Sequence, residues 1–166
     1  MQLTSVLICV FLVSSCVFAQ QPNRTPTTVV MARNVKRSEP GWRYIGGSCT
    51  CPPTVPGQVW RDNGTWERKD KFGNRQFVDV EIVKAASSDE TVEWMRRYGG
   101  AGGTTSSSCR VETYPLGDEG ALFTCTRSFK SQLNYRKGLF LIRVIGDSQT
   151  LVERFARYAL HVVPAT

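Results

Sequence analysis

The chain has 166 residues, of which 21 are basic and 14 acidic, for a formal net charge of +7. Residues 20–166 are enough for a single domain with its own core. Beyond the N-terminus no segment reaches the roughly 18 apolar residues that a transmembrane helix needs. The charge is mixed along the chain, which suits weak attraction to an anionic envelope surface and is too dilute to predict a nucleic-acid partner.

Residues 1–19 have the pattern of a secretory signal peptide. Residues 6–13 form an apolar run too short to span a bilayer, and Val17-Phe18-Ala19 fits a cleavage site, so the exported chain would begin at Gln20. The alternative is a lipoprotein, because Val13-Ser14-Ser15-Cys16 resembles a bacterial lipobox that would leave Cys16 lipidated at the membrane. Either way, we expect a periplasmic or extracellular protein.

Residues 20–40 are rich in Pro, Thr, Asn and Arg. This composition predicts a flexible linker, with a single domain over residues 41–166.

The first predicted feature of the domain is a hairpin. Residues 58–61 and 65–69 flank Asp62-Asn63-Gly64, and Asn-Gly favours a tight turn because both residues tolerate positive φ. Trp60 and Trp66 would then meet across the strand pair. We interpret them as packing residues, with a ligand-stacking role as the alternative.

Residues 76–85 alternate between apolar and charged side chains, which predicts a strand with one wet face. A helix is predicted over about residues 88–98, where Ser87 and Glu90 form a capping box. Residues 109–114 and 120–126 are predicted to be two further strands.

The end of the chain predicts a hairpin and a closing helix. Two β-prone runs, residues 131–135 and 139–145, flank Arg136-Lys137-Gly138. An amphipathic stripe over residues 148–163 predicts a helix that packs across the sheet. Arg136 and Lys137, in the turn of this hairpin, are candidate anion contacts, although most such pairs are simply solvated.

Four cysteines remain after cleavage: Cys49, Cys51, Cys109 and Cys125. An even number in an exported protein favours disulfides, and three connectivities stay open. A redox role for Cys49-Thr50-Cys51 is the functional alternative. Zinc is disfavoured, since its cysteines are usually two to four residues apart, so no metal or cofactor is expected.

Catalytic motifs are scarce. His161 is the single histidine, and no Gly-X-Ser-X-Gly is present. Asp118 and Glu119 are adjacent in a turn, so their carboxylates diverge, whereas an acid–base pair must converge. We therefore expect binding rather than catalysis.

Two short motifs carry a resemblance to a known family. Leu116-Gly117-Asp118-Glu119, then Tyr135-Arg136-Lys137-Gly138, an apolar strand and a terminal helix resemble PsbP-like exported bacterial domains. That class includes cell-envelope lipoproteins and the extracellular sensor domains of some membrane kinases. The resemblance covers about residues 76–163. It implies an antiparallel sheet flanked by helices, with binding or accessory roles, and no family binding residue carries over.

The sequence therefore predicts an α+β domain in which an antiparallel sheet packs against two main helices, at about residues 88–98 and 148–163, and is stapled by disulfides. Its predicted function is that of an exported, non-enzymatic binding, sensor or accessory module for a small ligand, a lipid or a protein. The alternative is a thiol–disulfide redox protein that uses Cys49 and Cys51.

Overall fold

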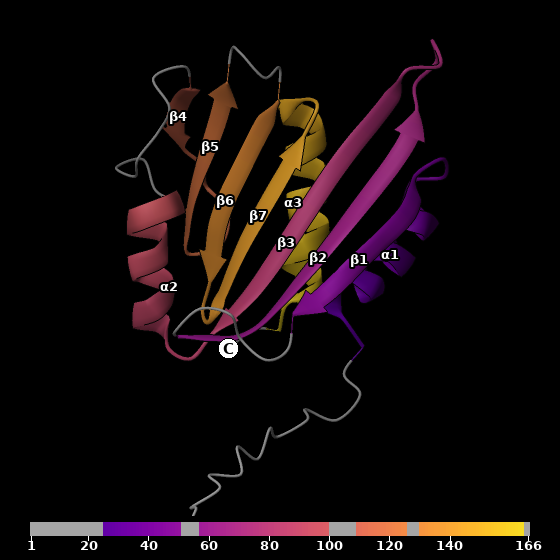
Figure 1. Cartoon of the computed structure of the whole chain (residues 1–166). Coiled ribbons are helices and arrows are strands. Elements are labelled where there is room, and N and C mark those ends of the chain that lie inside the picture. Colours follow the sequence, from indigo (N-terminus) through magenta and orange to yellow (C-terminus); the bar gives the residue numbers. More distant parts are fainter. Residues whose placement is uncertain (1–24, 51–56, 100–108, 126–129, 165–166) are drawn as a thin grey trace, which may run out of the picture.

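The computed structural model describes residues 25–50, 57–99, 109–125 and 130–164. One antiparallel sheet has the strand order β1-β2-β3-β7-β6-β5-β4 (Figure 1). Its strands are β1 (Arg43–Thr50), β2 (Gln58–Lys69), β3 (Arg75–Ala85), β4 (Cys109–Thr113), β5 (Glu119–Cys125), β6 (Ser131–Lys137) and β7 (Phe140–Gly146). The helices are α1 (Thr27–Ser38), α2 (Ser88–Trp94), the π-helix η1 (Met95–Gly99) and α3 (Gln149–Val162).

One face of the sheet is apolar, because successive side chains of a strand point to opposite faces. On β3, Val78, Val80 and Ile82 are buried, whereas Asp79 is exposed and Glu81 is half-buried. Helices α1 and α3 cover the apolar face, and α3 crosses behind the strands in Figure 1. The predicted alternation of residues 76–85 is confirmed.

Helix α3 lies where the sequence predicts the closing helix. The Ser148 side chain accepts a hydrogen bond from the Leu151 backbone N–H and so caps its first turn. The Tyr135 hydroxyl of β6 donates a 2.7 Å hydrogen bond to the Ala156 carbonyl of α3. Burial raises the pKa of this hydroxyl well above its usual value, so it stays protonated and holds the helix to the sheet.

The predicted architecture with two main helices is wrong. A third helix, α1, occupies residues assigned to a flexible linker, and its Met31 and Val35 are fully buried. The segment predicted as one helix over residues 88–98 is α-helical only to Trp94 and then continues as the π-helix η1. The α+β class and a disulfide are present. Helix α1 escaped prediction because its Thr, Val and Asn residues have weak helix propensity.

The hairpin predicted at Asp62-Asn63-Gly64 is also wrong, because β2 runs unbroken through these residues and pairs with β1 and β3 on both sides. A Cβ atom at Gly64 would lie 2.9 Å from the Thr28 Cβ atom of α1. Glycine is needed here for close approach of a helix and not for a turn. The turn between β2 and β3 instead contains Gly73, which has φ +86°.

Asp62 anchors the start of α1 from the neighbouring sheet. Its side chain is fully buried, and its Oδ2 accepts a 2.7 Å hydrogen bond from the Thr27 backbone N–H. Pro26, at the N-cap position, offers no side-chain cap. A carboxylate at a helix N-terminus satisfies a free N–H and complements the helix dipole. Helix α1 therefore depends on a residue 35 positions further along the chain.

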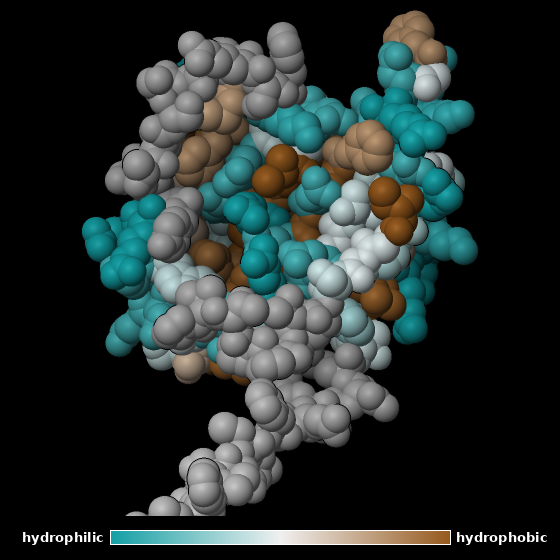
Figure 2. Space-filling view, viewed as in Figure 1, coloured by the Kyte–Doolittle hydropathy of each residue, from teal (hydrophilic) through white to brown (hydrophobic). Residues whose placement is uncertain are grey.

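The opposite face of the sheet is more polar, and Figure 2 shows hydrophilic residues over its middle with hydrophobic ones among them. Helix α2 and η1 lie beside this face, where they contact β3, β6 and β7. Met95 is fully buried, and the Thr91 hydroxyl lies 3.0 Å from the Gly138 carbonyl oxygen, to which it donates. One face of the sheet thus forms the core with α1 and α3, and the other, more polar face lies beside α2 and η1.

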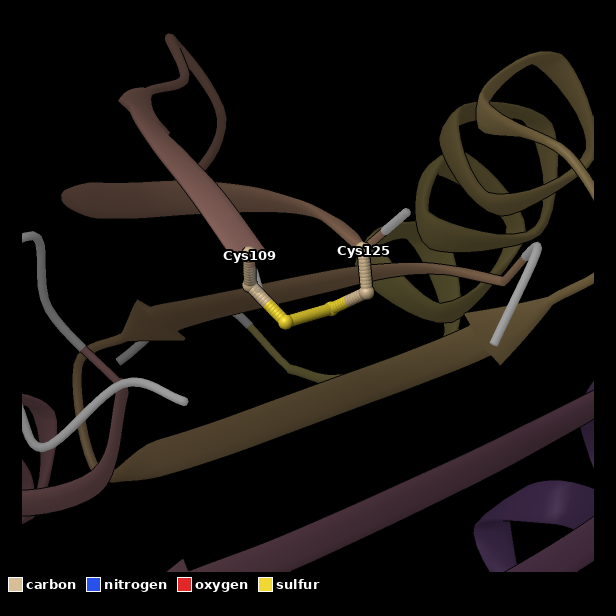
Figure 3. The surroundings of a disulfide bond; sticks show 2 residues. All are labelled: Cys109 and Cys125. Carbon is tan, nitrogen blue, oxygen red and sulfur yellow. A yellow bond between two sulfur atoms is a disulfide. The ribbon is translucent and has the colours of Figure 1, made fainter. Parts of the chain in front are cut away.

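A disulfide joins Cys109 and Cys125, which lie directly opposite each other on β4 and β5 (Figure 3). Their Cα atoms are 4.0 Å apart. Of the three connectivities left open by the sequence, the two that cross to Cys49 and Cys51 are excluded. The Cys49 side chain and Cys51 lie outside the described residues, as do the predicted signal peptide and Cys16. None of the described helices is long and apolar enough to cross a membrane.

Replacing the buried cap of α1 tests how strongly the N-terminal segment belongs to the domain. Asp62→Ala is expected to lower the free energy of unfolding by about 2 kcal/mol, since it removes a helix cap in a buried site. Urea denaturation measures the loss. The control is Asp79→Ala, which removes an exposed carboxylate that accepts a hydrogen bond from the Thr65 hydroxyl. It should lower the free energy of unfolding by less than about 0.5 kcal/mol. Equal losses would contradict the anchoring role.

Removing the disulfide by Cys109→Ser with Cys125→Ser is expected to lower the free energy of unfolding by about 3 kcal/mol, because the crosslink restricts the unfolded chain. Denaturation in oxidising buffer measures this difference. In a reducing buffer the unmodified chain should lose the same stability. A double variant as stable as the unmodified chain in oxidising buffer would show that the bond contributes nothing.

Candidate functional site

A pocket of about 790 Å³ lies between the polar face of the sheet and the α2–η1 segment. Strands β2, β3, β6 and β7 supply its floor, and the wall comes from residues between Ser87 and Arg97. Its volume is within the roughly 300–1,000 Å³ range of small-molecule sites. The hollowed face is the one seen in Figure 2.

Three charged side chains on neighbouring strands cross the floor. Glu81 of β3 lies directly opposite Arg143 of β7, and Arg61 extends from β2. One carboxylate oxygen of Glu81 pairs with the Arg61 Nε atom and the other with a terminal nitrogen of Arg143. A guanidinium carries five N–H donors. Both arginines are partly exposed, so each has donors left for a further acceptor in the pocket.

Gln58 lines the same pocket and carries a buried donor without a hydrogen-bond partner. It is only 6% exposed, and its Nε2 atom has no hydrogen-bond partner among the described residues. A buried donor left without a partner costs about 1–3 kcal/mol. Together with the two arginines, it places donors on the floor of the pocket, whereas the wall adds the carboxylates of Asp89, Glu90 and Glu93.

Apolar side chains complete the pocket. Val83 and Leu141 contribute to the floor, and Trp94 at the end of α2 contributes to the wall. The Trp94 ring is half-buried, unlike the tryptophans of the core. Sequence reasoning missed Trp94 and Gln58, because neither stands in a recognisable motif. Polar donors beside an aromatic ring and aliphatic side chains can accept a molecule with a charged end and an apolar body.

The wall also holds a fixed charge cluster. Hydrogen bonds from Arg96 and then Arg97 lower the pKa of Glu93 to about 2, so its carboxylate stays ionised. Arg96 donates to the two carboxylate oxygens over 2.7 and 2.8 Å. Glu93 is thus engaged by arginines of its own helical segment, and at this pKa its carboxylate is a very weak base near neutral pH.

The predicted binding candidates Trp60 and Trp66 lie in the core, on the face opposite the pocket. Their exposed fractions are 6% and 1%. The ring centroid of Trp60 is 5.8 Å from that of Phe140, and that of Trp66 is 5.6 Å from Phe155. They share one face of β2 instead of meeting across a hairpin, and their role here is packing.

The predicted anion contacts Arg136 and Lys137 are engaged by the protein itself. The Lys137 ammonium donates to the Leu160 and Val163 carbonyls, 3.2 and 3.4 Å away, at the end of α3. A cation at that place complements the helix dipole. Arg136 pairs with Glu119 over 3.1 Å. The structure brings neither residue into the pocket lining.

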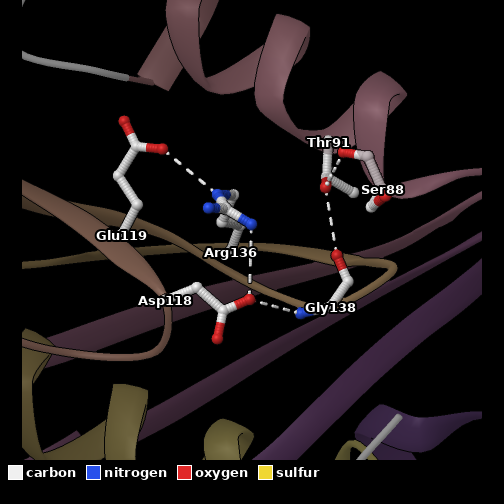
Figure 4. Close-up of polar contacts among 6 residues, drawn as sticks. All are labelled: Ser88, Thr91, Asp118, Glu119, Arg136 and Gly138. Carbon is white, nitrogen blue, oxygen red and sulfur yellow. Dashed lines mark hydrogen bonds and ion pairs between the residues drawn. The ribbon is translucent and has the colours of Figure 1, made fainter.

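The two motifs that resemble PsbP-like domains meet each other in the fold (Figure 4). The Asp118 carboxylate accepts hydrogen bonds from the Gly138 N–H over 2.8 Å and from Arg136 over 3.3 Å. The Asp118 N–H donates to the Arg136 carbonyl over 2.9 Å. The turn before β5 is thereby tied to the β6–β7 hairpin, and Thr91 ties the same hairpin to α2. These motif residues connect elements of the fold.

The remaining chemical candidates do not converge. The His161 Nδ1 atom lies 2.8 Å from the Arg157 carbonyl oxygen, on the exposed side of α3. Across the described ranges, no three His, Cys, Asp or Glu residues are grouped to hold a metal ion. The redox hypothesis rests on Cys49 and Cys51 and stays a prediction.

Comparison with known proteins assigns no family. No family model matches the sequence, and no curated protein matches it. A GTP binding regulator from Thermotoga maritima is structurally similar, with 13% sequence identity and a TM-score of 0.44, over 84% of this chain and 90% of that chain. At that level of similarity, the likeness transfers no function, and the resemblance to PsbP-like domains stays a prediction.

Gly117 offers a test of the connection between the motifs. Its φ is +69°, and a Cβ atom there would lie 2.2 Å from the Arg136 carbonyl oxygen. Gly73 has a similar φ of +86° with nothing within 4 Å of its Cβ position. Gly73→Ala should therefore cost about 1–2 kcal/mol of backbone strain. Gly117→Ala should cost at least about 2 kcal/mol more, because of the clash. Urea denaturation giving equal losses would contradict the close contact.

Proposed function

We propose that this chain is a non-enzymatic binding module for a small organic ligand that bears a carboxylate or a similar oxyanion. The observation that carries the proposal is Gln58, whose buried Nε2 donor has no partner among the described residues and lines the pocket. An acceptor on a ligand would satisfy this donor. The same acceptor chemistry suits the donors left on Arg61 and Arg143.

The charges of the floor favour an anion at that place, whereas the wall carries Asp89, Glu90 and Glu93 against Arg97. Glu81 is shared between two arginines, so this group of three carries a net positive charge. An oxyanion can take the donors on the far side of each guanidinium without displacing Glu81. At Glu81, a cation would have to compete with both arginines for a carboxylate that is only 16% exposed.

The rest of the ligand is apolar in this proposal. Val83, Leu141 and the half-buried Trp94 ring supply a surface for an alkyl chain or an aromatic ring. Aromatic side chains bury a large apolar area and also stack on planar groups. We therefore infer a ligand with one anionic end and a short apolar body.

A binding role agrees in kind with what the sequence predicts, namely an exported sensor or accessory module. The predicted export and the PsbP-like resemblance add to the proposal only as expectations. The redox alternative gains nothing from Cys109 and Cys125, because both are joined in a disulfide.

Matched acids and amides test the ligand class. At about ten times the dissociation constant, bound octanoate or 4-phenylbutyrate should stabilise the folded chain by about 1.4 kcal/mol and raise the melting temperature by about 3–5 °C. Octanamide and 4-phenylbutyramide should raise it far less, because they lack the charge. Thermal denaturation with each compound in turn measures the difference.

Variants locate the site. Arg143→Gln should abolish the shift produced by the acids, whereas Arg110→Gln, an exposed arginine on β4, should leave it intact. Gln58→Met should weaken the response to the acids and also stabilise the free protein, since it removes a buried donor without a partner. Equal shifts for acids and amides, or an unchanged response in both pocket variants, would refute the proposal.

A further inference from the structure

The turn between β2 and β3 forms a second feature, separate from the pocket. Residues 69–75, here named the hairpin tip, project beyond the other strands at the upper right of Figure 1. Phe72 at this tip is 77% exposed, the largest exposed fraction among the exposed large hydrophobic residues of the described part of the chain. Figure 2 shows a hydrophobic patch at the end of the hairpin with hydrophilic surface beside it.

The hairpin tip is held in one conformation by its own hydrogen bonds. The Asp70 Oδ1 atom accepts from the backbone N–H groups of Phe72 and Asn74, each over 2.8 Å. The Asp70 N–H donates to the Asn74 carbonyl over 2.9 Å, and Gly73 supplies the positive φ that closes the turn. Phe72 is therefore presented to solvent by an ordered turn and has no place in the core.

Basic side chains surround the aromatic ring. Lys69, Lys71 and Arg75 belong to the tip, and the Lys71 ammonium lies 4.9 Å from the centre of the Phe72 ring. Just below, Arg43 pairs with Glu67, and a terminal nitrogen of Arg75 is 4.0 Å from the same carboxylate. The cations exceed the carboxylates at this end of the sheet, so the tip presents an aromatic ring inside a positive field.

We propose that the hairpin tip docks on an anionic phospholipid bilayer, with Phe72 among the lipid headgroups and the basic side chains on their phosphates. This interaction is additional to ligand binding in the pocket. Each basic residue near an anionic membrane surface contributes about fivefold in affinity, and a buried aromatic ring adds to this. Contributions of this size give reversible surface attachment.

The shape of the tip favours a bilayer over a protein partner. Stable protein interfaces bury about 800 Å² on each side around several packed residues. A narrow turn with one exposed aromatic side chain offers far less area. A bilayer accepts a single inserted ring and rewards the surrounding charge without requiring a complementary surface.

Vesicle binding of the full chain tests the proposal. Vesicles of phosphatidylcholine with phosphatidylglycerol in equal parts, in about 50 mM salt, should bind the chain more strongly than pure phosphatidylcholine vesicles do. Phe72→Ser should lower the partition coefficient about tenfold. Lys71→Gln with Arg75→Gln should lower it roughly 30-fold. Co-sedimentation measures the bound fraction.

Matched control variants remove an apolar side chain and two basic charges from parts of the surface outside the hairpin tip. Val92→Ser takes away an exposed apolar side chain of α2, and Arg96→Gln with Arg110→Gln removes two exposed charges from η1 and β4. All variants keep the same N-terminal residues, so a larger loss in the tip variants than in these controls is due to the hairpin tip. Affinity should fall in these controls by less than about twofold, the amount expected from net charge alone.

Fluorescence quenching at residue 72 reports membrane contact of the hairpin tip itself, whatever the N-terminal residues contribute to vesicle binding. In Phe72→Trp, brominated lipids should quench the new fluorescence, whereas the same lipids should leave the added fluorescence of Val92→Trp unchanged. Equal quenching in both variants, or tip variants that bind as well as the controls, would overturn the proposal. This test does not use the thermal stabilisation by octanoate or 4-phenylbutyrate that tests the pocket. Either proposal can therefore fail without the other.

Discussion

The contact of Phe155 with two tryptophans sets the arrangement of the whole domain. The Phe155 ring of α3 lies 4.9 Å from the Trp42 ring and 5.6 Å from the Trp66 ring, measured between centroids. Aromatic side chains bury a large apolar area, and edge-on contacts add to that stabilisation. The cluster fixes α3 across the strands, and α1 packs beside it on the same face. The strands beneath these helices send most of their large apolar side chains to that face.

The pocket is a consequence of this one-sided burial. Because side chains alternate along a strand, a buried residue can have polar neighbours on the other face, as Glu81 lies between Val80 and Ile82. Arg143 reaches the same surface from β7 by the same rule. A register slip of one residue would exchange the two faces. The packing that stabilises the core therefore also places the charged floor of the candidate site.

Residues with prominent chemistry in the sequence have mostly structural roles. Asp118 and Arg136 tie a turn to a hairpin, and Trp66 belongs to the core. The pocket instead depends on Gln58 and Trp94, which look ordinary in the sequence. The reason is physical. A polar side chain such as that of Gln58 indicates a binding site when burial leaves it without a hydrogen-bond partner. Burial is set by the packing of distant elements and leaves no local pattern.

The sequence by itself determined the features with a local physical cause, namely the alternating strand over residues 76–85, the hairpin after residue 131 and the closing amphipathic helix. Their periodicity and capping are properties of neighbouring residues. Only the tertiary structure decided that residues 27–38 form a helix, because that helix needs the buried carboxylate of Asp62 and the missing side chain of Gly64. The pocket was decided in the same way, since its lining comes from four strands and a helix that meet only after folding.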